Sequence, residues 1–182
     1  RRSSDLAILV GAGTVIADDC QLTVRHVKGI NPLRVVLDGR LRSPPESKIF
    51  KEQETAPTVV FTSDVSPEEK AAEIRSRGVK VERFGRSADG KIPLMEVLKH
   101  LGNSGVNSVL VEGGAEIFTS FIGGNLVDRV MMVIAPKLIG SDGIPVIGNL
   151  NIDYMSQVDS WKLHRIERLG VDVLLDVFLK EY

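Results

Sequence analysis

The stretch LAILVGAGTVIADDCQLTVR, residues 6–25, runs from an apolar segment through a glycine-rich turn into a polar segment. Residues 6–10 are apolar and stop at a glycine, which predicts a short buried β-strand. The turn nearly matches the dinucleotide fingerprint G-x-G-x-x-G, but its third position is Ile16, where close packing of a helix on the strand requires glycine or alanine. The acidic residue expected after the next strand is at best Asp38, which comes late. A Rossmann domain is therefore the weaker interpretation of this turn.

The composition is that of one ordinary globular domain. The chain has 182 residues, of which 43% are hydrophobic and 26% charged, enough to bury most of the apolar surface in a single core. A formal net charge of −1 argues against a nucleic-acid partner, because phosphate contacts need a basic surplus. No apolar run approaches the roughly 20 residues that cross a bilayer. We expect a cytoplasmic protein with one domain, residues 1–182, and no membrane partner.

Cysteine and histidine usage predicts no metal site. The single cysteine, Cys20, can form neither an intrachain disulfide nor a cysteine-based zinc site. The three histidines, His26, His100 and His164, are far apart in the sequence and lack the spacing of metal ligands. We therefore expect a protein without a bound metal.

Apolar, β-rich runs alternate with helix signals along the first two thirds of the chain. We expect strands at residues 6–10, 33–37, 58–62, 79–84 and 108–111. Ser66 at the N-cap, Pro67 at the first helical position and two acidic residues after it predict a helix that ends near Gly78. Pro93 begins a second helix, and a third begins within GGAEIFTSFI, residues 113–122.

The last third of the chain has a different pattern. Residues 127–135 predict a long strand with no helix signal after it. Residues 161–169 and 171–179 are two alternating runs separated only by Gly170, which predicts an antiparallel hairpin. The whole order predicts an α/β fold, in which a mostly parallel sheet carries antiparallel strands at one edge.

Two further glycine-rich turns suggest ligand binding. Residues 85–91 match G-x-x-x-x-G-K, but the next residue is Ile92 instead of the serine or threonine that would hold magnesium, so a surface connection is the better interpretation. The turn EGGAE, residues 112–116, lies between a predicted strand and a helix, where glycines let a ligand approach the backbone and the helix start suits a phosphate. Spacing alone leaves a ligand site and a merely solvated helix start equally open there.

Taken together, four segments resemble the reductase family of riboflavin biosynthesis. They are LAILVGAGTVIADDCQLTVR, NPLRVVLDGRLRSP, SVLVEGGAEIFTSFI and LVDRVMMVIAPKLIG, and they occur in the family's order over nearly the whole chain. The resemblance implies an α/β, dihydrofolate-reductase-like mixed sheet, mostly parallel, with an antiparallel C-terminal hairpin and helices on both faces. It also implies an NADPH site built differently from a Rossmann domain, so the mismatch at Ile16 is expected.

The resemblance implies both a cofactor site and a substrate site. The residues that match the family's cofactor contacts are Thr14, Asp18, Gly39, Arg40, Gly113, Gly114, Ala115, Glu116, Ile117 and Phe118. The residues that match its substrate contacts are Arg2, Leu22 and Arg25 at the ribose 5-phosphate end and Glu112 beside the nicotinamide. Because guanidinium groups suit phosphate oxygens, we also hypothesise that Arg40 and Arg42 bind the 2′-phosphate of NADPH.

The implied reaction is NADPH-dependent reduction of 2,5-diamino-6-(ribosylamino)-4(3H)-pyrimidinone 5′-phosphate to the ribitylamino compound. Hydride is delivered to the anomeric carbon of the opened imine, so the protein's tasks are positioning and control of charge. We hypothesise that the catalytic residue Glu112 stabilises the protonated imine. The resemblance further suggests a homodimer, and we expect the alternating C-terminal strands to supply its interface.

The sequence departs from the family at two places. Cys20 stands where the family usually has proline, which should affect the rigidity of the turn more than its chemistry. Family members begin with another strand before the segment that matches residue 1, so we expect that strand to be absent here. The deaminase domain of bacterial members needs a zinc site that one cysteine does not supply, and we therefore expect a stand-alone reductase of the archaeal and fungal type.

Three alternatives stay open at this point. The first is reduction of the deaminated compound, 5-amino-6-(ribosylamino)uracil phosphate. The second is a dihydrofolate-reductase-like oxidoreductase with another substrate, which would keep the cofactor residues without needing Arg2 and Arg25. The third is a module that binds NADPH without turnover.

Overall fold

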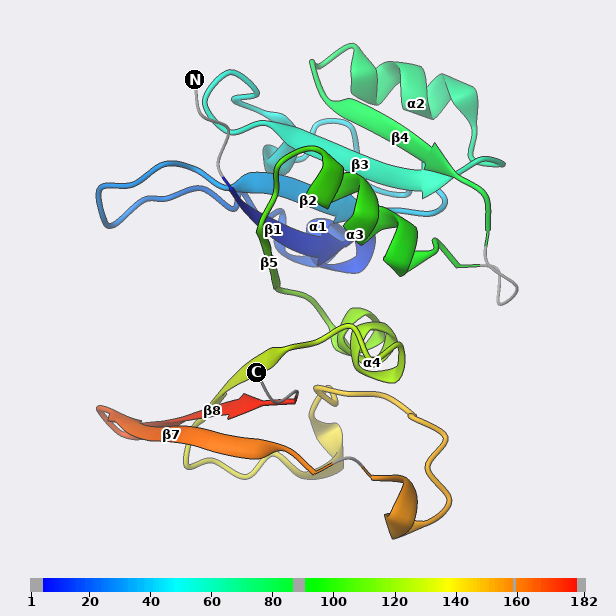
Figure 1. The fold of residues 1–182 in the computed structure, drawn as a ribbon. Coiled ribbons are helices and arrows are strands. Elements are labelled where there is room, and N and C mark those ends of the chain that lie inside the picture. Colours follow the sequence, from blue (N-terminus) through cyan, green and yellow to red (C-terminus); the bar gives the residue numbers. More distant parts are fainter. Residues whose placement is uncertain (1–4, 87–90, 159, 180–182) are drawn as a thin grey trace. The chain divides into compact units, whose positions relative to one another are not determined.

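A computed structural model describes residues 5–86, 91–158 and 160–179 of the chain (Figure 1). The chain divides into two compact units, Arg1–Ile117 and Phe118–Tyr182. The first contains a parallel sheet and the second an antiparallel sheet. Among the described residues, none of the helices combines the length and the apolar character that crossing a bilayer requires.

Five parallel strands form the sheet of the first unit, in the spatial order β4-β3-β2-β1-β5. Along the chain they are β1 (Leu6–Gly11), β2 (Leu33–Leu37), β3 (Thr58–Ser63), β4 (Lys80–Phe84) and β5 (Ser108–Val111). The first four strands are added side by side in one direction, whereas β5 pairs with the opposite edge of β1. The strand order therefore reverses at β1, and open parallel sheets bind ligands outside the carboxyl ends of the strands at such a reversal.

The parallel sheet forms because its central strands are apolar on both faces. All six residues of β3 are buried, and so are the last five of β1 and the last four of β2. Continuous apolar runs of this kind are typical of parallel strands covered on both faces. The strand predictions were correct to within one residue in all five cases.

Three helices lie within the first unit, and one of them was not predicted. They are α1 (Ala12–Asp18), α2 (Glu68–Arg75) and α3 (Leu94–Asn103). The sequence indicated only a turn at α1, because glycines at positions 11 and 13 lower helix propensity. The helix forms because Ala12 and Val15 are buried, and Val15 joins the core cluster that also contains Val10 and Val36.

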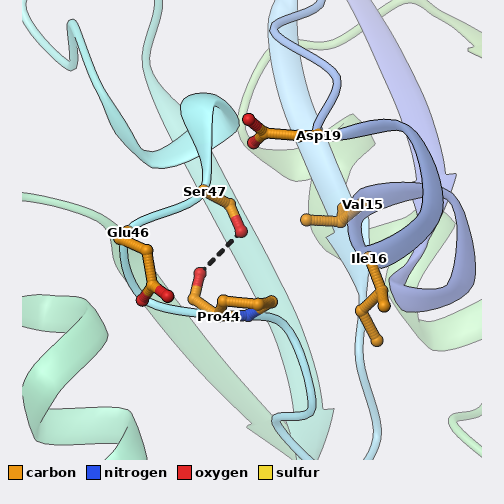
Figure 2. A pocket seen from close by; sticks show the side chains of 6 residues that line it. All are labelled: Val15, Ile16, Asp19, Pro44, Glu46 and Ser47. Carbon is orange, nitrogen blue, oxygen red and sulfur yellow. Dashed lines mark hydrogen bonds between the residues drawn. The ribbon is translucent and has the colours of Figure 1, made fainter.

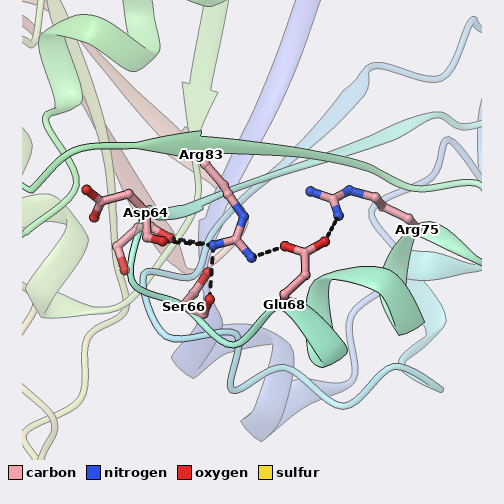
Figure 3. A network of polar contacts seen from close by, with 6 residues as sticks. Asp64, Ser66, Glu68, Arg75 and Arg83 are labelled. Carbon is pink, nitrogen blue, oxygen red and sulfur yellow. Dashed lines mark hydrogen bonds and ion pairs between the residues drawn. The ribbon is translucent and has the colours of Figure 1, made fainter.

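The start of α2 differs from the prediction by one residue. Pro67, not Ser66, is the N-cap residue, and the hydroxyl of Ser66 has no partner among the described residues. The Arg83 guanidinium on β4 accounts for this difference, since it binds the carbonyls of Asp64 and Ser66 at 3.0 and 2.9 Å (Figure 3). It also pairs with Glu68 at 2.6 Å, so the turn before α2 is held by β4 instead of by a serine cap.

The second unit contains the antiparallel sheet. Its strands β6 (Arg129–Ile134), β7 (Lys162–Leu169) and β8 (Asp172–Phe178) have the order β6-β8-β7. β7 and β8 form the predicted hairpin around Gly170, whose φ of +65° suits glycine. The predicted class, α/β with a mostly parallel sheet and an antiparallel C-terminal hairpin, is confirmed. The antiparallel strands were expected at one edge of the parallel sheet, but the hairpin pairs with β6 in a sheet of its own.

The remaining elements are short or cross the boundary between the units. α4 (Ala115–Gly123) begins in the first unit and ends in the second. The described residues also include three short 3-10 helices, η1 (Lys48–Phe50), η2 (Gly140–Asp142) and η3 (Met155–Gln157). Of these, η1 contributes Ile49 and Phe50 to the core of the first unit.

Candidate active site

The carboxyl ends of β1, β2 and β5 lie side by side in the first unit (Figure 1). The register pairs Gly11 with Leu37 across β1 and β2, and it pairs Leu9 with Val111 across β1 and β5. The Glu112 N–H then donates to the Leu9 carbonyl at 2.8 Å. The segments that follow these three strands therefore leave the sheet at one edge, and they contain most of the predicted cofactor residues.

The segment after β1 is α1, which carries Thr14 and Asp18. Since they are four positions apart on a helix, they share one face. Thr14 is half-buried and Asp18 is exposed. Gly13 is exposed in the first turn, and a Cβ atom added there would meet nothing within 4 Å. The backbone at the start of α1 is consequently open to a ligand.

The segment after β5 approaches β1 closely. A Cβ atom at Gly11 would lie 2.9 Å from Cγ1 of Ile117, and one at Gly113 would lie 3.4 Å from Cβ of the same side chain. Glycine at position 11 thus makes room for Ile117 against the end of β1, whereas a Cβ atom at position 113 would make an ordinary contact. Gly114 is exposed with open space at its Cβ position, which leaves the backbone before α4 accessible.

The other predicted residues of this segment lie in the first turn of α4. Ala115 and Ile117 are half-buried and Glu116 is exposed. Phe118 follows them on the helix and is the first residue of the second unit. A nine-residue helix directs the positive end of its dipole toward the glycines before it, an arrangement that suits a phosphate.

Glu112 occupies the junction of β5 and this glycine turn. Its side chain is exposed, and its carboxylate makes no hydrogen bond or ion pair with any residue that the structure describes. Burial raises the pKa of the Cys20 thiol, and the negative charges of Asp18, Asp19 and Glu112 raise it further. Glu112 therefore belongs to an acidic region that includes the C-terminal end of α1.

The segment after β2 is a tight loop that contains Gly39 and Arg40. Gly39 is half-buried beside β3, whose Ser63 hydroxyl donates to the Gly39 carbonyl at 2.7 Å. Arg40 is exposed. A Cβ atom at Gly39 would lie 3.6 Å from Cγ1 of Ile92, the residue that replaces the magnesium-binding hydroxyl of a P-loop. Ile92 is thus a packing residue, although residues 87–90 of that motif lie outside the described part of the chain.

The predicted substrate residues lie before β1 and in the loop between α1 and β2. Arg2 lies outside the described residues. Leu22 has a positive φ of 52° and packs against the core cluster, and Arg25 is exposed in the loop between α1 and β2. The Val24 N–H in that loop binds the side chain of Asn31 at 2.8 Å, close to the amino end of β2. The role of Arg25 in binding the substrate stays a prediction.

A cavity of about 190 Å³ opens beside α1 but is not the predicted site (Figure 2). It lies between the helix and the loop that precedes η1, where the Ser47 hydroxyl donates to the Pro44 carbonyl at 2.7 Å. Its lining residues are Val15, Ile16, Asp19, Pro44, Glu46 and Ser47. The cavity is smaller than the roughly 300–1,000 Å³ typical of ligand pockets and contains none of the predicted contacts. The candidate site is instead the open edge formed by the ends of β1, β2 and β5.

The residues at this edge fit a dinucleotide. Exposed glycines at positions 13 and 114 leave the backbone accessible, a helix start faces the second glycine turn, and an exposed arginine follows β2. In the described part of the chain, no group of three or more histidine, cysteine, aspartate or glutamate side chains is arranged to hold a metal ion. Because of its open glycines, helix start and exposed arginine, the arrangement can bind a phosphorylated cofactor, with the carboxylate of Glu112 beside it.

Two residues of this edge were missed as functional candidates. Asp38 was considered only as a late acidic residue of a Rossmann pattern, and Ser63, which directly follows the predicted strand of residues 58–62, was given no role. Both support the loop after β2: Asp38 is buried at its start, and Ser63 binds the Gly39 carbonyl. The one available signal was an aspartate followed by glycine directly after a buried strand.

Comparison with known proteins gives consistent results. The family model described as RibD C-terminal domain matches residues 1–175. A protein of Methanothermobacter thermautotrophicus is 36% identical, covering 99% of this chain and 82% of its own length. One of Archaeoglobus fulgidus is also 36% identical, covering 93% of this chain and 77% of its own length. Both are named 2,5-diamino-6-ribosylamino-4(3H)-pyrimidinone 5′-phosphate reductase.

Solved structures are similar to the chain as well. RibD of Acinetobacter baumannii has a TM-score of 0.79 at 30% identity, covering 96% of this chain and 47% of its own. The chain thus spans about half the length of that protein. A pyrimidine reductase-like protein of Corynebacterium diphtheriae has the same TM-score of 0.79 at 19% identity, which shows a shared fold.

Proposed function

Because the chain belongs to the RibD C-terminal domain family, we propose that it reduces 2,5-diamino-6-ribosylamino-4(3H)-pyrimidinone 5′-phosphate to the ribitylamino compound in riboflavin biosynthesis, with NADPH as the hydride donor. The resemblance predicted from the sequence is confirmed by the family match, which extends over residues 1–175. One structural observation carries the proposal: the turns after β1, β2 and β5 leave the sheet at one edge, around the point where the strand order reverses.

The diamino compound is the favoured substrate. The two archaeal relatives, which are named for reduction of this compound, are similar to the chain over more than three quarters of their own length. The deaminated compound is the alternative, since a relative from Thermotoga maritima is described as a combined deaminase and 5-amino-6-(5-phosphoribosylamino)uracil reductase, and this chain covers 45% of it. The two substrates differ only on the pyrimidine ring, so a direct comparison of rates distinguishes them.

Different residues of the site contact different parts of the cofactor. Backbone N–H groups before α4 suit the pyrophosphate of the cofactor, with Gly113 and Gly114 allowing its approach. We assign Thr14 and Asp18, which share one face of α1, to contacts with the cofactor next to the end of β1. NADPH, when bound, supplies the hydride, and the protein orients the two reactants so that the transfer is effectively intramolecular.

Reduction of the substrate requires stabilisation of the positive charge that forms when the imine is protonated. The closed ribosylamine ring opens to an imine, hydride adds to the anomeric carbon, and the former imine nitrogen gains a proton. A protonated imine is the better electrophile, and a carboxylate beside it stabilises the cation. We assign this task to Glu112, whose exposed carboxylate has no partner within the described part of the chain.

The decisive experiment mixes the purified protein with each pyrimidine and NADPH and follows the nicotinamide absorbance. We expect oxidation that needs both protein and substrate and is faster with the diamino compound. Faster turnover of the deaminated compound would favour the alternative substrate. Binding of NADPH without oxidation by either compound would favour a reductase for another substrate or a binding module.

We further propose that both units act as one reductase domain and that the protein is a homodimer. The apolar side chains exposed on β6 and β7 support the dimer: Met131, Val133, Leu163 and Ile166 are each more than half exposed. Light scattering during size-exclusion chromatography should find a particle of twice the mass of one chain. A particle with the mass of one chain would contradict the dimer and leave the proposed activity untouched.

A further inference from the structure

The cavity beside α1 is not used by the proposed function. Its volume of about 190 Å³ lies between the C-terminal half of the helix and the segment that precedes η1 (Figure 2). Because a water molecule occupies about 30 Å³ in the liquid, this space holds about six waters or one ligand of similar size. Its apolar lining comes from Val15, Ile16 and Pro44. The cavity therefore suits a small molecule that is partly apolar.

One wall of the cavity is a rigid turn formed by residues 44–47. The N–H and the hydroxyl of Ser47 both donate to the Pro44 carbonyl, at 3.0 and 2.7 Å. The rings of Pro44 and Pro45 restrict the backbone further, since each fixes its own φ. Directly after the turn, Phe50 of η1 is 2% exposed and belongs to the core cluster. This wall is therefore already in place for a ligand to enter.

The other wall is α1, and Asp19 at its C-terminal end joins it to η1. The carboxylate of Asp19 accepts the Lys48 N–H at 2.8 Å and lies 3.1 Å from the Lys48 ammonium. Figure 2 shows Val15 and Asp19 pointing from the helix toward the segment that carries Ser47. The two walls are consequently connected before any ligand binds, so little conformational entropy is lost on binding.

The polar side chains that line the cavity offer acceptors and no free donor. The hydroxyl of Ser47 already donates to a carbonyl, and the carboxylate of Asp19 is paired with a lysine. Glu46 is exposed, and its carboxylate makes no hydrogen bond or ion pair within the part of the chain that the structure describes. A ligand must therefore supply the donors and a positive charge, together with an apolar body for the rest of the lining.

We propose that this cavity is a second ligand site, which binds a small primary alkylammonium ion with its charge beside Glu46 and its apolar chain against α1. A helix of 3.6 residues per turn places Val15 and Asp19 about 100° round its axis from Thr14 and Asp18. The cavity therefore lies on a different face of α1 from the proposed cofactor contacts. The site does not depend on the reductase activity.

The test titrates the ¹⁵N-labelled chain with n-butylammonium chloride at constant ionic strength and follows the amide signals by NMR. The signals of Ile16 and Ser47 should shift and saturate with a Kd of about 1–10 mM, as expected for a ligand of about five non-hydrogen atoms. n-Butanol has the same size without the charge and should bind at least about fivefold more weakly. Equal affinity for the two ligands, or no saturable shift at these amides, would overturn the proposal.

Glu46→Gln isolates the role of the free carboxylate. It removes the charge and keeps the size of the side chain, so the Kd for n-butylammonium should rise about fivefold. The affinity for n-butanol should stay within about twofold of the wild-type value. The matched control is Glu73→Gln, an equally exposed change on α2 that should leave both affinities unchanged. An equal loss in both variants would reflect only the overall charge of the protein and would contradict the role of Glu46.

Ile16→Phe tests whether binding occurs in the cavity itself. Ile16 is 48% exposed at its lining, so the folded chain can accommodate a larger side chain there. The phenyl ring should narrow the cavity and weaken both ligands by at least about tenfold, and the NMR spectrum shows directly whether the variant is folded. Unchanged affinities in a folded variant would place the binding elsewhere and overturn the site. These titrations contain neither cofactor nor pyrimidine, so no result among them bears on the proposed reductase activity.

Discussion

Arg34 is the largest side chain that is fully buried in the first unit, and it carries a charge into the interior. Its guanidinium donates to the carbonyls of Gln21 at 3.1 Å, of Lys51 at 2.7 Å, and of Ala56. Burial lowers the pKa of Arg34 to about 10, so the group stays protonated at neutral pH. One side chain on β2 therefore satisfies the backbone of two loops that would otherwise need water.

Removal of this guanidinium should destabilise the protein strongly. In Arg34→Met the three carbonyls lose their donor inside the fold, and we expect the free energy of unfolding to fall by about 3 kcal/mol. The exposed Arg77→Met is the control and should change it by less than about 0.5 kcal/mol. Urea denaturation of the two variants measures the difference. Equal stability of both variants would mean that water replaces the guanidinium.

Glu112 is the residue on which the proposed chemistry depends. Glu112→Gln keeps the size of the side chain and removes the charge that stabilises the imine, so kcat should fall by about tenfold or more. The Kd for NADPH should stay within about twofold, since the substitution leaves the backbone before α4 unchanged. Steady-state kinetics and titration calorimetry measure the two quantities. Glu96→Gln, an exposed change on α3, is the control, and unchanged turnover in Glu112→Gln would refute the assignment.

At the scale of elements, α1 shows how tertiary packing overrides local preference. Glycines at positions 11 and 13 argue against a helix, yet seven residues adopt one because Ala12 and Val15 are buried against the sheet. The helix ends at Asp18, and its C-cap residue Asp19 has a φ of 44° and a carboxylate that accepts the Lys48 N–H at 2.8 Å. The N–H and ammonium groups of Lys48 lower the pKa of Asp19, so this helix end is joined to η1.

The two glycines at the start of α1 should respond oppositely to alanine. Gly11→Ala places a Cβ atom 2.9 Å from Ile117 Cγ1 and should lower the free energy of unfolding by about 1–3 kcal/mol. Gly13→Ala meets nothing within 4 Å in a helical position and should raise it by about 0.5–1 kcal/mol. Parallel urea titrations test both. A stabilising Gly11→Ala would show that Ile117 moves away easily.

At the scale of the whole molecule, the free energy of unfolding depends on pH through carboxylates that lie beside cationic side chains. The pKa of Asp19 is lowered by Lys48, that of Glu68 by Arg75, and that of Asp176 by Arg129. In the unfolded chain these groups titrate near pH 4, so below that pH the unfolded state binds more protons than the folded state. Their contribution to the free energy of unfolding is therefore present above about pH 4. It is lost as the pH falls through the lower pKa values that these groups have in the folded state.

We expect the urea midpoint to be steady near neutral pH and to fall progressively below about pH 4. Asp176→Asn should weaken this dependence, because it removes a fully buried titrating group whose partner Arg129 lies 2.5 Å away. A pH series of urea titrations from neutral to acidic conditions measures both slopes. Identical slopes in the variant and the wild type would show that Asp176 contributes nothing to the acid response.

The sequence by itself determined the elements that depend on local pattern. Apolar runs between turns located all five parallel strands, and the signals around residues 66–69 and 93 located α2 and α3 with a shift of one residue at Ser66. The resemblance of four segments identified the family and marked Thr14, Gly39, Arg40 and Glu112 as candidates. These signals are readable because periodicity and capping involve residues only a few positions apart.

Only the tertiary structure decided the strand order, the presence of α1 and the role of Asp38. Pairing of β5 with β1 joins residues about 100 positions apart, and no local pattern encodes that choice. Asp38 acts through hydrogen bonds to Arg42 and Ser43 that exist only once Leu41 is buried. The physical reason is the same in each case: burial against distant segments is what stabilises these features, and its free energy belongs to the assembled fold and not to the segment.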